Sequence, residues 1–264
     1  MKKRTHKKEV RFNFGENWKE FSENALDESK LRKSMNSLNA LIGKDRIKGS
    51  CFLDIGCGSG LFSIAASLMG AKKVVAFDVS KESIGASLIN KKKFAPNNKI
   101  SFSINSVFDA KISKLGKFDI VYSWGVLHHT GKMLKSIDIS TSLVKKNGLF
   151  VIAIYEKHWS SPLWKLIKKT YNISPKYIKK IMIMLFYWVI AFAKLVVTKK
   201  NPFADKKRGM DFYYDVVDWM GGYPYEYASR QEIESYVEKK GFKLVRFVKS
   251  HVPTGCNEYV FSRN

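Results

Sequence analysis

The sequence LDIGCGSG, at residues 53–60, joins an acidic strand end to three glycines at alternate positions. A dinucleotide-binding turn has the spacing Gly-x-Gly-x-x-Gly, and a phosphate-binding loop continues as Gly-Lys followed by Ser or Thr. Neither pattern occurs here, because the glycines are Gly56, Gly58 and Gly60 and Leu61 follows them. Glycine has no Cβ, so this turn predicts a ligand that lies close to the backbone without depending on a phosphate.

Two carboxylates at expected strand ends indicate the chemistry of that ligand. Asp54 precedes the glycine turn, where its charge would repel a pyrophosphate but attract an ammonium group. Asp78 ends the next apolar run, VVAFD, and a carboxylate there can accept two hydrogen bonds from ribose hydroxyls. A ligand with a ribose and an amine, and with no need for a phosphate, fits S-adenosylmethionine. We therefore predict S-adenosylmethionine as the cofactor.

Five successive motifs resemble those of the class I S-adenosylmethionine-dependent methyltransferases. They are LDIGCGSG, VVAFDVS, NSVFDA, FDIVYSWGVLHHTG and KNGLFVIAIYE, and the resemblance is strong over residues 50–155. It implies methyl transfer from S-adenosylmethionine. It also implies a set of cofactor contacts, namely Asp54, Gly56, Cys57, Gly58, Gly60, Asp78, Val79, Phe108, Asp109 and Trp124.

Within this set, the resemblance gives each part of the cofactor its own residues. The glycine turn would meet the methionine part, Asp54 would hold the amino group and Asp78 the ribose diol. The adenine would contact Val79, Phe108 and Asp109. Trp124 has two interpretations, because an aromatic residue at a strand end can line the cofactor or substrate site or belong to the core.

The order of expected elements predicts an α/β fold. Strands are expected at residues 51–55, 73–77, 99–104, 118–123 and 149–155, with helices at 61–69, 80–90 and 131–145 between them. A helix at 230–240 and two strands at 242–249 and 258–262 follow, joined by a tight loop. The pattern predicts a Rossmann-like three-layer sandwich with a mostly parallel seven-stranded sheet and a C-terminal antiparallel hairpin.

The chain divides into four expected parts. Residues 1–48 form an N-terminal helical segment with a break near Asp27, and residues 49–155 form the cofactor-binding core. Residues 156–228 interrupt the strand–helix alternation and predict a helical cap insertion. Residues 229–264 return to the core and complete its sheet.

His128 and His129 follow the fourth expected strand and are the candidate catalytic residues. Methyl transfer from a sulfonium is an in-line displacement, so the enzyme mainly aligns the reactants and excludes water. A base is needed only when the nucleophile carries a proton of high pKa, and His129 could take that proton from a hydroxyl. The alternative is that the pair shapes its loop and caps the next helix.

The segment DFYYDVVDWMGGYPYEYAS, at residues 211–229, concentrates aromatic and acidic side chains in a basic chain. It predicts a substrate pocket formed by Asp215, Asp218, Trp219, Tyr223 and Glu226, together with Tyr155. The alternative is that the rings pin the cap to the sheet while the acids pair with lysines. With FNFGENW and GCNEYVF, this segment is similar to a subgroup related to ubiquinone-biosynthesis O-methyltransferases. The long insertion departs from those enzymes and leaves the acceptor open.

The insertion contains an apolar run, IMIMLFYWVIAFAKLVV, at residues 181–197, with lysines on both sides. Three interpretations compete: a buried cap helix, a helix in the interface of an anionic membrane, and a lid over a lipophilic substrate. A single-pass anchor fits less well, because the last helix and hairpin must return to the same domain.

The formal net charge of +24 favours polyanionic partners, either nucleic acid or an anionic membrane surface, although a general lysine bias gives the same value. The three cysteines indicate a reducing compartment, and no apolar run follows the basic N-terminus. We therefore predict a cytoplasmic protein, with peripheral contact at the inner membrane face as an extension.

The main functional hypothesis is a methyltransferase acting on an oxygen of a small or lipid-like acceptor. The first alternative is an RNA or protein methyltransferase, and the second is a non-catalytic subunit that only binds the cofactor. No metal site is expected. The acceptor and the oligomeric state are not predicted.

Overall fold

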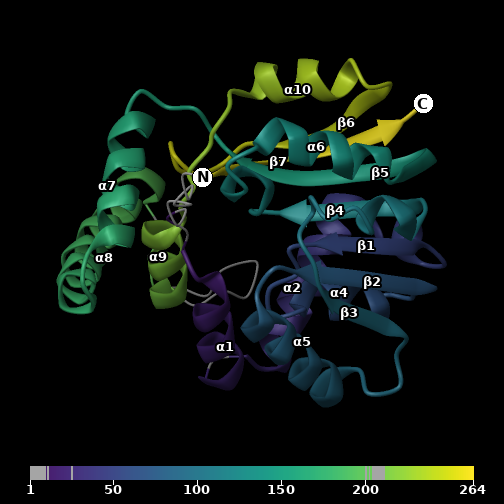
Figure 1. Cartoon of the computed structure of the whole chain (residues 1–264), viewed down its shortest axis with the longest axis horizontal. Helices are drawn as coiled ribbons and strands as arrows, with labels where there is room; N and C mark the ends of the chain where they lie inside the picture. The colour runs from purple at the N-terminus through teal and green to yellow at the C-terminus, as the bar shows by residue number, and fades with distance from the viewer. Residues whose placement is uncertain (1–9, 11, 25, 200, 202, 204–211) are drawn as a thin grey trace, which may run out of the picture.

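The sheet of the computed structural model has seven strands in the order β3-β2-β1-β4-β5-β7-β6 among the described residues, which are 10, 12–24, 26–199, 201, 203 and 212–264. The strands are β1 (Cys51–Ile55), β2 (Lys73–Asp78), β3 (Ile100–Ile104), β4 (Phe118–Trp124), β5 (Val144–Tyr155), β6 (Phe242–Val248) and β7 (Cys256–Arg263). Only β7 runs antiparallel to its two neighbours (Figure 1). The predicted fold class is therefore confirmed.

The helices follow the expected order. They are α1 (Phe14–Asn24), α2 (Glu28–Ile42), α3 (Lys44–Ile47), α4 (Leu61–Leu68), α5 (Lys81–Phe94), α6 (Met133–Ser142), α7 (Ser161–Ile173), α8 (Lys176–Thr198), α9 (Phe212–Gly221) and α10 (Arg230–Glu238), with short 3₁₀ turns η1 (Ile112–Leu115) and η2 (Leu127–His129). The predicted break near Asp27 is confirmed, because the Asp27 carboxylate accepts a hydrogen bond from the Lys30 N–H and caps α2. The basic run at residues 1–9 lies outside the described part of the chain.

The predicted boundary between α6 and β5 is wrong. The helix expected at residues 131–145 ends at Ser142, and β5 begins at Val144. Val144 is fully buried and pairs with Phe118 of β4, so burial against the sheet overrides the helical pattern. The pair Asn147–Gly148, which is typical of a helix end, lies inside β5 instead, near a shift in the pairing with β4.

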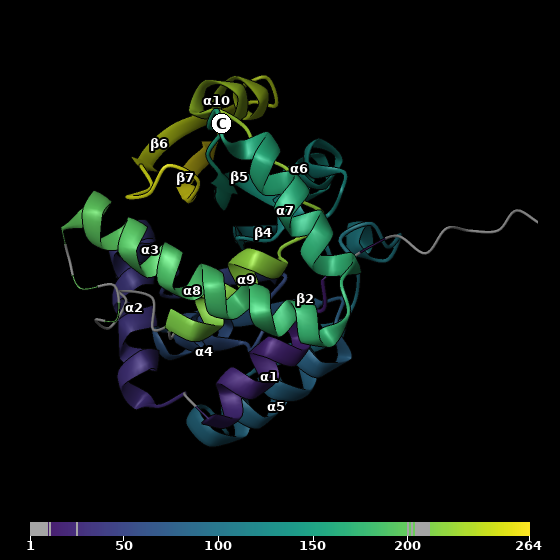
Figure 2. The same cartoon turned by 90° about the vertical axis from the view of Figure 1, so that its left-hand side faces the viewer.

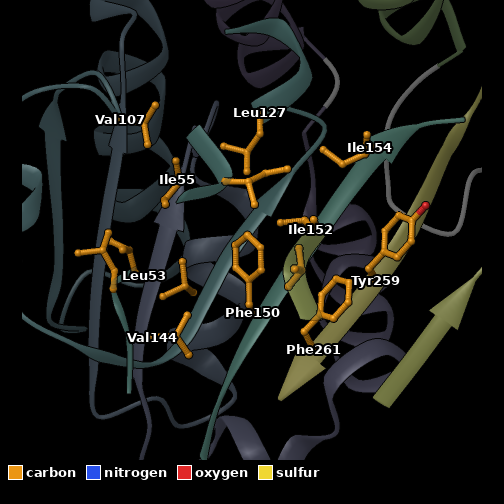
Figure 3. Packing of buried hydrophobic residues seen from close by; sticks show 14 of the residues in the cluster. Leu53, Ile55, Val107, Leu127, Val144, Phe150, Ile152, Ile154, Tyr259 and Phe261 are labelled. Carbon is orange, nitrogen blue, oxygen red and sulfur yellow. The ribbon is translucent and has the colours of Figure 1, made fainter. Parts of the chain in front are cut away.

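The two faces of the sheet carry separate cores because side chains alternate along each strand. On one face, Phe150 and Ile152 pack with residues of α6 and α10, as Figure 3 shows for the strand residues. On the other face, Leu149 and Val151 pack with residues of α2, α3 and α4. These layers make the sheet rigid and fix where its strand ends lie.

The helices α7, α8 and α9 form the cap, which lies beyond one end of the sheet (left in Figure 1). They share a small core of their own, in which Tyr171, Ile183, Ala191, Phe212, Val216 and Met220 are buried. Figure 2 shows α8 crossing the front of the molecule, with α9 behind it. The cap is thus an apolar unit placed next to the strand ends.

The helix α8 contains the apolar run at residues 181–197 and is mostly exposed. Only 11% of its most apolar window is buried, and by length and composition alone this helix could cross a membrane. The interpretation as a buried cap helix is therefore wrong. Only a narrow side that includes Ile183 and Ala191 packs against the other cap helices, because nothing in the described chain covers the opposite side.

The cap of α2 provides a test of local stability. Replacing Asp27 by Ala should lower the free energy of unfolding by about 1 kcal/mol, because the Lys30 N–H loses its acceptor. Thermal denaturation measures this change. Asp27→Asn is the matched control, since its amide oxygen can still accept the bond, and a similar loss in both variants would contradict the capping role.

Candidate active site

A cavity of about 890 Å³ opens at the carboxyl ends of β1, β2, β4 and β5. Open α/β sheets bind their ligands at this edge. The core side of the cavity is formed by the ends of these strands, and the other side by residues of α1, the cap and the loop between β6 and β7. The position of the cavity therefore follows from the topology of the sheet.

The glycine turn after β1 is held in a conformation that other residues rarely adopt. Gly56 and Gly58 have φ values of 74° and 54°. A Cβ on Gly56 would lie 2.4 Å from a Val126 methyl carbon, and one on Gly58 would lie 3.0 Å from the Trp18 ring. Positive φ and the absence of space both require glycine here. Gly56 lines the cavity, whereas Gly58 is covered by Trp18.

The two predicted carboxylates stand on the cavity wall. Asp54 is buried, and its Oδ2 accepts a hydrogen bond of 2.6 Å from the Ser63 hydroxyl. Asp78 accepts backbone N–H bonds from Gly58 at 3.0 Å and from Ser80 at 2.9 Å, one on each oxygen. A carboxylate has about four acceptor positions, so Asp78 can still receive hydroxyl donors. Burial raises the pKa of Asp78 above the usual 3.8, and the N–H donors oppose this shift.

The residues predicted to contact the adenine are only partly brought together. Val79 and Phe108 line the cavity, and Val79 is 66% exposed, so an apolar surface is available to a planar ring. Asp109 does not line it, because its carboxylate accepts the Ser106 N–H at 2.8 Å and closes a local turn. Asn105 and Ser106 line the cavity in this region instead.

The remaining predicted cofactor contacts fall into two groups. Cys57 and Trp124 line the cavity, and the Trp124 indole N–H donates to Glu258 of β7 at 2.5 Å. Burial raises the pKa of the Cys57 thiol well above its usual value, so it stays protonated. Gly60 does not line the cavity and begins α4, where a Cβ would lie 2.9 Å from Phe102 and Ser87 atoms.

The two candidate catalytic histidines have different surroundings. His129 lines the cavity, and its Nδ1 lies 2.7 Å from the Pro224 carbonyl oxygen. With a proton on Nδ1 donated to that carbonyl, Nε2 carries the lone pair. Burial lowers the pKa of His129 to about 3, so the ring is neutral at physiological pH and is a hydrogen-bond acceptor rather than a strong base. His128 is fully buried and does not line the cavity.

The predicted acceptor residues gather around the cap side of the cavity. Tyr155, Asp215, Asp218, Trp219 and Tyr223 all line it. Asp215 pairs with Lys194 of α8 at 3.2 Å, and Asp218 accepts the Asn17 side-chain N–H at 2.7 Å. Asp215 thus pairs with a lysine, as the alternative interpretation expects, and Asp218 ties α9 to α1. The substrate role of these residues stays a prediction.

Glu226 is the predicted acceptor residue that does not line the cavity. Both of its carboxylate oxygens lie near the Met133 N–H, at 3.2 and 3.1 Å, where α6 begins. It therefore satisfies a free N–H at a helix start, where a negative charge is favourable. Its spacing from Trp219 in the sequence could not show this, because the contact depends on the path of the loop.

Sequence reasoning missed the part of the wall formed by residues near the N-terminus and by the hairpin loop. Phe12, Phe14 and Trp18 line the cavity, as do residues 252–256. The helix α1 is held over the site by Asn17, whose side chain donates to both Asp218 and the Tyr214 carbonyl. The dense aromatic residues of FNFGENW are the signal in the sequence for this part of the wall.

A mostly parallel seven-stranded sheet, with a glycine turn after β1 and an acid at the end of β2, defines the class of S-adenosylmethionine-dependent methyltransferases. The model of the methyltransferase domain family matches residues 47–206, and the chain belongs to this family. It is an enzyme of this class, and S-adenosylmethionine is its methyl donor. Among the described residues, no group of three His, Cys, Asp or Glu side chains is placed to hold a metal ion.

Individual relatives share less than a third of their aligned residues with this chain. The ubiquinone biosynthesis O-methyltransferase of Pelagibacter ubique is 29% identical over 72% of this chain and 73% of that protein. A protein of the same name from Rhodopseudomonas palustris is 28% identical over 50% of this chain, and the match covers only 48% of its own length.

Solved structures share the fold. The magnesium protoporphyrin IX methyltransferase of Synechocystis PCC 6803, with bound S-adenosylhomocysteine, has a TM-score of 0.58 at 17% identity and covers 94% of this chain and 93% of its own. PKMT2 from Rickettsia typhi, in complex with the same product, has a TM-score of 0.59 at 15% identity and covers 88% of this chain and 53% of its own. At these identities, the likeness concerns the fold alone.

The Asp78 carboxylate provides the sharpest test of cofactor binding. Asp78→Ala should weaken S-adenosylhomocysteine binding by about tenfold or more, because two charge-assisted hydrogen bonds are lost. Isothermal titration calorimetry measures the dissociation constant. Asp109→Ala is the control, since Asp109 lies outside the cavity, and its affinity should remain unchanged. Equal affinities of Asp78→Ala and the wild type would refute the ribose assignment.

The same residue predicts a pH dependence. Ribose hydroxyls donate to the ionised carboxylate, so the affinity should fall as the pH decreases and Asp78 gains a proton. Burial raises the pKa of Asp78, so this loss should begin at a higher pH than the usual value of 3.8 would give. Calorimetric titrations between about pH 4 and pH 7 measure this change in the affinity for S-adenosylhomocysteine. An affinity that is constant down to the lowest pH would contradict it.

Proposed function

We propose that this enzyme transfers the methyl group to an oxygen of a small or lipid-like acceptor with an aromatic or apolar body. The observation that carries this proposal is the composition of the cap side of the cavity. Trp164, Trp219 and Ile190 of the cap line it, with Phe14 of α1 and the neutral ring of His129 beside them. The names of the relatives that match, which are O-methyltransferases of ubiquinone biosynthesis, support an oxygen acceptor.

The cavity residues suit the cofactor, and we assign their roles as part of the proposal. Asp78 would hold the ribose diol, Asp54 the amino group, and Val79 and Phe108 the adenine. The fit rests on the Asp78 carboxylate on the wall and on Gly56, where no Cβ has space. When bound, S-adenosylmethionine supplies a methyl group already activated on a sulfonium.

The chain's own residues then have two tasks. The rings of Tyr155 and Trp219 exclude water and orient the acceptor, which is the main requirement of a displacement with a good leaving group. The Nε2 of His129 accepts a hydrogen bond from the acceptor hydroxyl and directs the oxygen. With a pKa of about 3, His129 does not need to become charged for this role.

A label partition tests the proposed reaction. The purified enzyme is incubated with methyl-labelled S-adenosylmethionine and a cell extract, which is then separated into lipid, small-molecule, RNA and protein fractions. We expect label in the lipid or small-molecule fraction, and hydriodic acid, which cleaves O-methyl ethers, should release it. Asp78→Ala is the control that should lose transfer. Label confined to RNA or protein would overturn the proposal in favour of the polymer alternative.

The second part of the proposal concerns the membrane. The outward side of α8 exposes a stripe of large apolar side chains, namely Tyr177, Ile181, Met184, Leu185, Trp188, Val189, Phe192, Leu195 and Val196. Trp188 is 64% and Phe192 is 69% exposed. Exposed patches of this kind mark an interaction site, and the lysines at both ends of α8 suit an anionic lipid surface. We therefore propose that this stripe rests on an anionic leaflet.

The opposite side of the same helix supports a link between membrane and acceptor. Ile190, Ala193, Lys194 and Val197 of α8 line the cavity. One helix thus separates the proposed lipid contact from the acceptor side of the site, which suits an acceptor that enters from the bilayer. We propose a cytoplasmic location with peripheral binding of α8 to the membrane.

Vesicle sedimentation tests the membrane contact. The double variant Trp188→Glu/Phe192→Glu should bind vesicles that contain phosphatidylglycerol at least about tenfold more weakly, since each buried ring contributes about 1.5–3 kcal/mol. S-adenosylhomocysteine affinity should be unchanged, because neither side chain lines the cavity. Val245→Glu is the matched control, because Val245 is an apolar residue on β6 that is 54% exposed. Unchanged sedimentation of the double variant would remove the membrane proposal.

A further inference from the structure

Lys168 of α7 is a fully buried charged residue that the proposed reaction does not yet use. Its side chain is 0% exposed, and its Nζ makes no hydrogen bond within the described chain. The Nζ lies over three aromatic rings, 4.4 Å from the centre of Trp219, 5.0 Å from Tyr225 and 5.7 Å from Tyr155. Lysines are rarely buried without a partner, because the loss of hydration is costly. The rings offset only part of that cost.

Titratable groups face Lys168 from every element around it. They are Asp218 on α9, Cys256 on β7, His128 and His129 on η2, Tyr155 at the end of β5, and Tyr225 in the loop between α9 and α10. Burial lowers the pKa of Lys168 to about 7, while Asp218 and Cys256 act in the opposite direction. Asp218 also accepts a hydrogen bond from the Asn17 side-chain N–H, so its negative charge is divided between Asn17 and Lys168. Lys168 in turn lowers the pKa of His129, after the larger effect of burial.

The position of Lys168 places this charge directly behind the cavity wall. Tyr155 and Trp219, the rings that it contacts, line the cavity themselves. A charge acts more strongly through such an apolar wall than through water. A bound sulfonium would add a second positive charge to the same space. Asp218 offsets part of this positive charge. An acceptor oxyanion would compensate more of the remainder than a neutral acceptor could.

We propose that Lys168 is a positioning residue that selects an acceptor with an acidic hydroxyl, such as a phenol, and favours its oxyanion before methyl transfer. This inference rests on the proposed O-methylation and names its acceptor class. The O–H bond breaks first, and the proton leaves to solvent. The oxygen then forms a bond to the methyl carbon while the carbon–sulfur bond breaks, with its electron pair remaining on sulfur.

The properties of His129 support the role proposed for Lys168. An imidazole with a pKa of about 3 cannot hold a proton taken from a phenol, since the phenol is the far weaker acid. Stabilisation of the anion therefore has to come from a positive charge. Lys168 supplies that charge without contacting the acceptor, and His129 orients the oxygen.

The test uses 4-nitrocatechol, whose oxyanion absorbs visible light, added to the full chain saturated with S-adenosylhomocysteine. We expect the wild type to bind the oxyanion and to lower the apparent pKa of the probe. Lys168→Met should bind it about tenfold more weakly and abolish the pKa change, because a unit charge acting through the wall is lost. Lys168→Arg keeps the charge and should recover part of the effect. S-adenosylhomocysteine affinity, measured on each variant, reports intact folding.

The pH dependence has a definite sign. Lys168 is charged below its own pKa, so affinity for the oxyanion should be highest at lower pH and should fall as Lys168 loses its proton. The pKa of Lys168 is about 7 without a ligand, and a bound anion raises it, so the loss should occur above pH 7. In Lys168→Met this fall should be absent. A loss of packing alone would not remove a pH profile.

Three results would overturn the inference. The first is equal affinity and pH dependence of Lys168→Met and the wild type. The second is failure of the wild type to bind the probe. The third concerns the wild type alone and decides the question if Lys168→Met does not fold. It is that the wild type binds the neutral 1,2-dimethoxy-4-nitrobenzene as tightly as it binds 4-nitrocatechol. The label partition keeps the two proposals apart, because label in an O-methyl ether with any of these results leaves the proposed function standing.

Discussion

The site depends on one constraint, which is the sharp turn of the chain where β1 ends. Gly56 and Gly58 take positive φ values there, and the N–H of Gly56 donates to the Phe77 carbonyl at the end of β2. The turn thereby ties two strand ends together and brings the Gly58 N–H to Asp78. The acidic wall, the start of α4 and the contact with Trp18 all follow from this geometry. A side chain at Gly56 would displace them together.

Around this fixed centre, the cap supplies the variable half of the cavity. The core side is polar and hydrogen-bonded through Asp54 and Asp78, whereas the cap side is mainly aromatic. This contrast matches a reaction in which the charged donor is held by the core and an apolar body by the cap. Lys168 lies where the two halves meet, behind the rings of Tyr155 and Trp219. The cap therefore also supplies a buried positive charge next to the acceptor side of the cavity.

The sequence predicted the core well and the cap poorly, for physical reasons. Strand alternation and the glycine turn are local patterns, so β1, β2 and the break near Asp27 could be predicted directly. Exposure of α8 could not, because an apolar run looks the same whether protein or solvent covers it. The positions of Asp109 and Glu226 depend on loop paths, and the burial of Lys168 depends on three segments far apart in sequence. Only tertiary packing decides such contacts.

Segments from opposite parts of the chain close the same cavity. Trp18 comes from α1, and Cys256 comes from β7, which lies between β5 and β6 in the sheet. The strands that form the donor side of the cavity precede both the cap and the loop before β7 in the sequence, and these later segments supply much of the opposite wall. The cavity closes only when β7 pairs with β5. The acceptor wall therefore depends on the pairing of β7 with β5, whereas the donor residues Asp54 and Asp78 lie on strands that do not contact β7.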